Sequence, residues 1–97
     1  MTLDALDRMI GATLLVRITY LKPDETVGHV AEFAGVVTSV DPLVTIERGG
    51  DEPFTLPPDP DAFEVGVPGE YHLHSTGAIV VNPDYTSIWT VHEPQRE

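Results

Sequence analysis

The sequence predicts a mainly β protein, a small and strongly bent β-barrel with a short N-terminal helix and an extra β-hairpin in the C-terminal third. Apolar and polar residues alternate in several short segments, and these segments are rich in valine, isoleucine and threonine. Eight glycines and nine prolines separate them at short intervals, as turns require. At 97 residues the chain is expected to form one domain over residues 1–97, with a single core.

Residues 2–10 are expected to form a short helix. Leu3, Leu6 and Ile10 follow the i, i+3, i+7 spacing of one apolar helix face. Gly11 suits the position just after a helix end, because glycine adopts positive φ without steric cost. Nine residues are too few for a helix to be stable alone, so this one should lie on the open end of a sheet.

Residues 13–21 alternate with period two and predict the first strand. One face is apolar throughout, and the other still carries Leu15 and Leu21 among polar residues. Together with Trp89 these leucines give more apolar surface than a monomer of this size is expected to bury. We therefore take Leu15, Leu21 and Trp89 as candidate interface residues for self-association.

The second strand is expected to run from about residue 26 to residue 40, which is long enough that it should bend. Gly28 and Gly35 are the expected bending points, because glycine within a strand often marks a bulge or a barrel corner. Two alternatives remain open for the inward face. Unbroken alternation groups Val30, Ala34, Val36, Thr38 and Val40, whereas a bulge at Gly35 turns Phe33 inward together with Val36.

Asp41–Pro42 predicts a tight turn into a third strand at residues 43–48. Residues 49–52 begin with two glycines and predict a hairpin turn, after which residues 54–56 return as a short fourth strand. Residues 57–61 contain three prolines and should leave the sheet, because proline lacks the backbone donor that a central strand needs.

The last third predicts short β-segments again. Residues 62–67 should be extended, and further strands are expected at 71–75, 78–81 and 86–92. The first two of these strands flank Ser-Thr-Gly and should form a hairpin. Residues 93–97 are expected to be a flexible polar tail.

Charge and composition narrow the range of functions. The formal net charge of −11, with a single lysine, argues against nucleic-acid and anionic-membrane partners, since binding to both depends on Lys and Arg. No apolar run reaches the roughly 20 residues that cross a bilayer. The acidic start lacks the basic region of a signal peptide, and the absence of cysteine suits the cytoplasm, so a cytoplasmic location is expected.

The order of a short helix, a strand, a long bent strand and an aspartate-containing turn resembles the Sm-like fold, a small SH3-like β-barrel whose members commonly form rings. The matching residues are Ile10–Gly11, Val16–Ile18 and Phe33–Asp41, within residues 3–50. The resemblance implies ring assembly and, in the RNA-binding members, a nucleotide pocket.

The resemblance would place Asp41 and Arg48 in such a ligand or RNA pocket. However, the asparagine that follows the aspartate in RNA-binding members is absent, because Pro42 and Leu43 follow here. The Arg-Gly of the family's second motif is absent from the last third, and Arg48–Gly49 comes early, where a hairpin turn explains it. The residues therefore argue against RNA binding.

His72 and His74 lie two apart on a predicted strand, so both imidazoles should project from one face. With a third ligand they could hold a divalent metal, zinc or nickel rather than calcium, and His29, His92, Glu70 or Asp84 could supply it. Ordinary polar patterning of an exposed strand is the alternative. No other cofactor is indicated.

The sequence gives little support to an enzyme. Most acidic residues lie in predicted turns, and the serines lack the context of a nucleophile elbow. No phosphate-binding loop or dinucleotide motif is present. The leading hypothesis is a non-enzymatic, self-associating barrel that acts as a scaffold or binding module, with a ring as one possible assembly and no other protein partner identified. Metal or small-ligand binding at the His72/His74 face is the alternative, and Sm-like RNA binding a further, disfavoured one.

Overall fold

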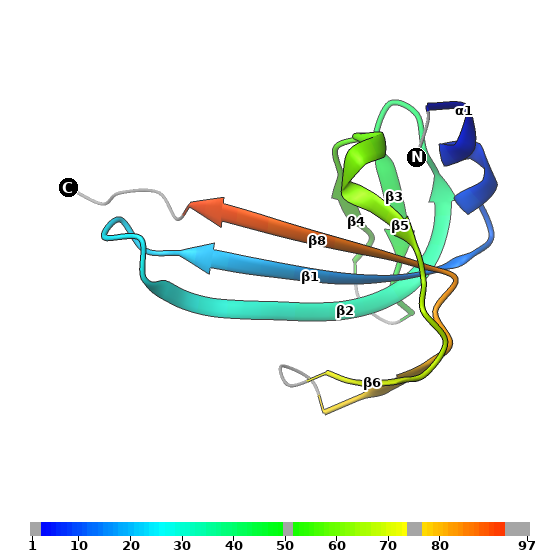
Figure 1. Cartoon of the computed structure of the whole chain (residues 1–97). Helices are drawn as coiled ribbons and strands as arrows, with labels where there is room; N and C mark the ends of the chain where they lie inside the picture. The colour runs from blue at the N-terminus through cyan, green and yellow to red at the C-terminus, as the bar shows by residue number, and fades with distance from the viewer. Residues whose placement is uncertain (1–2, 50–51, 74–76, 93–97) are drawn as a thin grey trace.

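The computed structural model describes residues 3–49, 52–73 and 77–92, and it shows a mainly β protein (Figure 1). Six strands form one curled sheet in the order β4-β3-β2-β1-β8-β5, and two more form a separate hairpin sheet, β6-β7. The strands are β1 Thr13–Leu21, β2 Val27–Ser39, β3 Val44–Glu47, β4 Phe54–Leu56, β5 Phe63–Val65, β6 Glu70–His72, β7 Ile79–Val81 and β8 Tyr85–His92. The large sheet is a half-barrel, with β4 and β5 at its two ends. The mainly β class and the extra C-terminal hairpin are confirmed.

The N-terminal helix is much shorter than predicted. The α-helix α1 spans Leu3–Leu6 and continues as a single 3-10 turn, η1, over Asp7–Met9. Leu6 and Met9 are buried in the core at the open end of the sheet, as expected of a helix that cannot stand alone. Ile10 is extended and exposed rather than part of the apolar helix face, because the chain leaves the helix after Met9.

β1 and β2 form the centre of the sheet as a long antiparallel pair. The predicted alternation in β1 is confirmed, since Leu14, Val16 and Ile18 are buried in the core. The expected irregularity at Gly28 is also present, because the register passes from Tyr20↔His29 to Leu21↔Val27 and leaves Gly28 without a partner.

The alternative in which β2 has a bulge at Gly35 is wrong. The register with β1 runs unbroken through Gly35, and the second irregularity falls between Val37 and Ser39. Glycine is required at position 35 for a different reason. The neighbouring strand β3 lies so close that a Cβ here would overlap the carbonyl oxygen of Glu47. The glycine is needed for the close approach of two strands.

Neither predicted alternative for the inward face of β2 is correct. Phe33 packs against the core and Val37 is fully buried, whereas Val36 is exposed. The alternation of Phe33, Gly35 and Val37 is therefore the inward phase, and the irregularity after Val37 returns Val40 to the core. Apolar residues occupy both faces of this strand, so the sequence pattern does not show which face is inward.

The proline-rich segment leaves the sheet as predicted. After β4 the chain forms a 3-10 turn, η2, at Pro60–Ala62, and Asp59 caps it by accepting a hydrogen bond from the Asp61 amide at 3.0 Å. Phe63 follows in β5 and is buried in the core. Across the described residues, no helix is both long and apolar enough to span a bilayer.

β8 sets the overall shape because it pairs in parallel with all of β1 except Thr13, from Leu14↔Tyr85 to Leu21↔His92. β3 pairs with β2 only from Val36 onward, and β5 pairs with β8 only as far as Ser87. Beyond these points β2, β1 and β8 continue as a three-stranded extension, residues 27–32, 17–21 and 88–92, which we call the arm (Figure 1). It contributes to a longest dimension of 41 Å.

Candidate binding surfaces

The arm has two open strand edges. Within the described part of the chain, no strand pairs with β8 beyond Ser87 on the side away from β1. The same holds for β2 before Val36, on its side away from β1. Open edges present backbone donors and acceptors that can continue a sheet into another chain. The arm is therefore built like a surface for strand addition.

Exposed apolar side chains lie beside these edges on both faces of the arm. Ile88 is 70% exposed on the outer face, and Val91 is 41% exposed on the concave face. On the concave face the ring of Tyr20 also stacks on the imidazole of His29, with centroids 4.3 Å apart. Apolar residues beside an open edge strengthen strand pairing, because they add side-chain burial to the backbone hydrogen bonds.

β8 is also free of formal charge. Its eight residues, Tyr85–His92, include no Asp, Glu, Lys or Arg, although the chain carries a net charge of −11. Natural edge strands are commonly protected from pairing by lysine, proline or a bulge, and β8 has none of these. A strand that pairs with β8 therefore meets no formal charge within it.

A buried hydrogen-bond chain fixes the side chain of Trp89 in β8. The Trp89 indole Nε1–H donates to the Ser87 hydroxyl at 2.6 Å, and that hydroxyl donates to the Ala62 carbonyl oxygen at 2.7 Å. Ser87 is only 2% exposed, and Phe63 packs edge-on against the Trp89 ring with centroids 6.2 Å apart. The base of the arm is thereby tied to the half-barrel.

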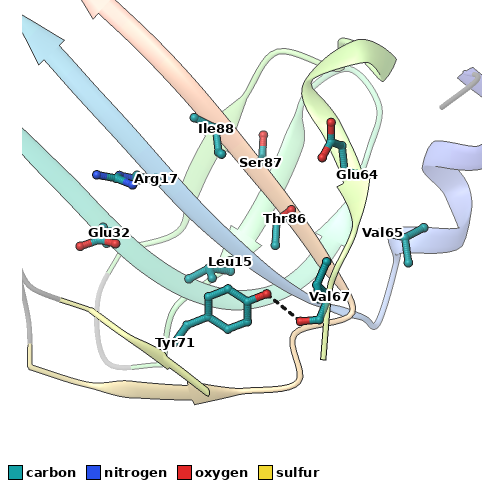
Figure 2. Close-up of a pocket in the computed structure, with 10 residues that line it drawn as sticks. All are labelled: Leu15, Arg17, Glu32, Glu64, Val65, Val67, Tyr71, Thr86, Ser87 and Ile88. Atoms are coloured by element: carbon teal, nitrogen blue, oxygen red, sulfur yellow. Dashed lines mark hydrogen bonds between the residues drawn. The ribbon is translucent and has the colours of Figure 1, made fainter. Parts of the chain in front are cut away.

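A groove lies between the outer face of the large sheet and the β6–β7 hairpin, which folds back beneath it (Figure 2). The fold-back is held where Gly66 donates its amide to the Asp84 carbonyl at 2.8 Å and the amides of Gly69 and Asn82 each bond across the two chain segments. The groove has a volume of about 230 Å³.

The groove walls are mostly apolar. Leu15, Thr86 and Ile88 line the sheet side, and Val67 and Tyr71 line the hairpin side. The Tyr71 hydroxyl donates to the Val67 carbonyl at 2.6 Å, and the Ser87 hydroxyl is engaged by Ala62. Arg17 and Glu32, opposite each other in the β1–β2 register, stand at one end. This arrangement offers a shaped, mostly apolar surface.

The predicted metal face is only partly described. His72 lies in β6 and is exposed, with its Nε2 3.7 Å from Glu70 Oε2, while His74 lies outside the described residues. Neighbouring strand residues point to opposite faces, so Glu70 and His72 point away from the groove that Tyr71 lines. Among the described residues, no group of three potential metal ligands is close enough to hold an ion.

Asp41 and Arg48 are not brought together. They lie beyond opposite ends of β3, which spans Val44–Glu47. Arg48 is engaged within its own hairpin, where its Nε and Nη2 donate to the Glu52 carbonyl oxygen at 3.0 and 2.8 Å. Its guanidinium also lies over the Phe33 and Phe54 rings, at 5.1 and 5.4 Å from their centroids. These contacts give Arg48 a structural role.

The three predicted interface residues have different surroundings. Leu15 is almost buried in the groove, whereas Leu21 and Trp89 are half-buried within the arm. What sequence reasoning missed is the exposed edge of β8. The signal was available as an uncharged run of eight residues in a strongly acidic chain.

No family model, curated protein or solved structure matches this chain.

Proposed function

We propose that this protein is a non-enzymatic scaffold or binding module that works by self-association, with the arm as the assembling element. One observation carries the proposal: the three-stranded arm extends past β3 and β5, and no described strand pairs with either of its outer edges. A single isolated layer of three strands buries little of its own apolar surface, so a second layer or further strands would stabilise it.

The Sm-like resemblance of residues 3–50 is part of this proposal, because Sm-like proteins commonly assemble into rings and the arm is proposed to mediate assembly here. This part of the proposal is supported by the order of short helix, strand, long strand and turn. We do not extend the proposal to RNA binding, since Asp41 and Arg48 lie apart and the net charge is −11. The cysteine-free sequence supports a cytoplasmic place of action.

Sedimentation velocity and native mass spectrometry across a micromolar concentration range test the proposal. We expect the weight-average mass to rise above the 10.6 kDa of one chain with increasing concentration. A clean monomer at every concentration would contradict self-association.

Salt gives a second, independent readout. Two acidic chains repel each other at long range, and salt screens that repulsion, so added salt should strengthen self-association. Binding to an oligonucleotide would weaken with salt instead, because it depends on counterion release. A mass that falls with added salt would count against assembly through an uncharged edge.

A further inference from the structure

We infer that two copies of this chain pair through the β8 edge of the arm, antiparallel and about a two-fold axis at Thr90. This inference rests on the proposed self-association and identifies its interface. It predicts a closed dimer, in which the two three-stranded arms join into one continuous sheet, rather than a ring.

The direction of the backbone groups in β8 follows from a hydrogen bond at its start. Gly66 donates its amide to the Asp84 carbonyl at 2.8 Å, so the backbone groups of Asp84 point toward β5. Backbone direction alternates along a strand, so Thr86, Ile88, Thr90 and His92 direct their groups to the same side. Thr86 meets Glu64 of β5 there, and beyond Ser87 no described strand continues on that side. Thr90 therefore lies at the centre of the open edge.

An antiparallel pairing centred on Thr90 also matches side chains across the axis. Thr90 pairs with its own copy, and Ile88 lies opposite His92 of the second copy on the outer face. On the concave face Trp89 lies opposite Val91, which is 41% exposed in the single chain. Threonine pairs and aromatic–β-branched pairs are both favourable across antiparallel strands. The same patch meets itself, as a two-fold interface requires.

Charge and edge geometry favour β8 over β2 as the pairing edge. β8 has no formal charge, so the acidic copies meet at a neutral strand. The β2 edge carries the acid Glu32 and is interrupted near its start by the irregularity at Gly28. Bulges and charges are the features that blunt strand edges against pairing. Pairing β8 with β2 would be head-to-tail and would give rings or filaments, whereas pairing β8 with itself closes at two copies.

Two matched proline variants test the interface. Val30 in β2 and Thr90 in β8 flank the same residue, Thr19 of β1, so they occupy equivalent rows at the two edges of the arm. The Val37 amide and carbonyl bond to Ala12 and Gly11 on the β1 side, so alternation directs the Val30 amide to the open β2 edge. Proline is tolerated on an edge strand when the lost N–H faces solvent. Each variant thus removes one edge donor and keeps the bonds to β1.

The measurement is the dimer dissociation constant by sedimentation, with circular dichroism as the check on folding. We expect Thr90→Pro to weaken the dimer by at least about tenfold, because it removes both central hydrogen bonds, one from each copy, and keeps the strands apart at that point. Val30→Pro should leave the dissociation constant unchanged. The interface of one strand pair is small, so the parent dissociation constant is expected in the micromolar range.

Cross-linking keeps the test decisive if Thr90→Pro does not fold. The chain has no cysteine, so Thr90→Cys introduces a single thiol by a small change. Directly paired residues in an antiparallel sheet have Cα atoms about 4.5 to 5.5 Å apart, within the reach of a disulfide. Mild oxidation should give a covalent dimer for Thr90→Cys and not for the control Val30→Cys.

Each outcome has one meaning. A parent protein that stays monomeric overturns the proposed self-association itself. A parent dimer that survives in a folded Thr90→Pro variant, with no disulfide from Thr90→Cys, overturns the β8 interface and leaves self-association standing. Larger assemblies that both proline variants break indicate head-to-tail pairing of β8 with β2, and they also overturn the two-fold dimer.

Discussion

Replacing Ser87 with alanine tests whether one buried hydroxyl ties β8 to the half-barrel. Ser87 is 2% exposed, and its hydroxyl joins the Trp89 indole N–H at 2.6 Å to the Ala62 carbonyl at 2.7 Å. Ser87→Ala removes the middle of this chain and leaves one donor and one acceptor without their partner. The perturbation is small in volume, so its cost comes from polar groups rather than from a cavity.

The magnitude follows from those two bonds. Each contributes about 0.5–1.5 kcal/mol net, and an unsatisfied buried group costs about 1–3 kcal/mol. Trp89 is half-buried, so a hydrogen bond to water can partly replace the one that its indole N–H loses. We expect Ser87→Ala to lower the free energy of unfolding by about 2 kcal/mol, which corresponds to a drop in Tm of roughly 8–16 °C for a domain of this size.

Urea unfolding followed by the fluorescence of the single tryptophan measures this cost, with far-UV circular dichroism as a second probe. The protein should be kept dilute, because dimerisation would add a concentration-dependent term to its stability. Ser39→Ala is the control, since that hydroxyl donates to the Asp41 carbonyl at 3.1 Å in a more exposed place. A loss for Ser87→Ala of less than about 0.5 kcal/mol, equal to the control, would refute the structural role of the chain.

Two further predictions concern Gly35 within β2 and Asp24 in the turn before β2. Gly35→Ala should destabilise the domain by about 1–3 kcal/mol, because the added Cβ would overlap the Glu47 carbonyl and force β2 and β3 apart; chemical denaturation measures this, and an unchanged midpoint would contradict the close approach. Hydrogen bonds from the Thr26 hydroxyl and amide hold the pKa of the Asp24 carboxyl below its usual value of 3.8. Because the folded pKa is depressed, this contribution to stability is present above that value and is lost as the pH falls through the folded pKa. An NMR titration should therefore show the Asp24 carboxyl resonance moving at a lower pH than in the Thr26→Val variant, and equal midpoints would count against it.

Local patterns predicted much of the secondary structure. Alternation in residues 13–21 gave β1 and its buried face, because period two is a property of the strand itself. Glycine and proline placed the connections around β3 and β4 and the excursion at residues 57–61, since both act through local backbone geometry. The hairpin of β6 and β7 was predictable for the same reason.

Other features depended on contacts that local patterns do not contain. The phase of β2 could not be chosen because valines and alanines occupy both of its faces, and only the positions of β1 and β3 decide which face is inward. The role of Gly35 also depends on such a contact, since a Cβ at this position would overlap the Glu47 carbonyl oxygen. The helix at residues 2–10 was overestimated because its apolar spacing continues past Met9, where the chain already turns into the sheet.

The candidate interface also combines a feature that the sequence predicts with one that depends on the tertiary structure. The sequence by itself determined that the protein is mainly β and acidic, with a strand expected at residues 86–92, because composition and periodicity are written along the chain. Only the tertiary structure decided that this strand lies in parallel beside β1 and at an open edge. Strand order is set by which distant residues share a core, here Val16 beside Ser87 some 70 residues later, and no local pattern encodes that choice.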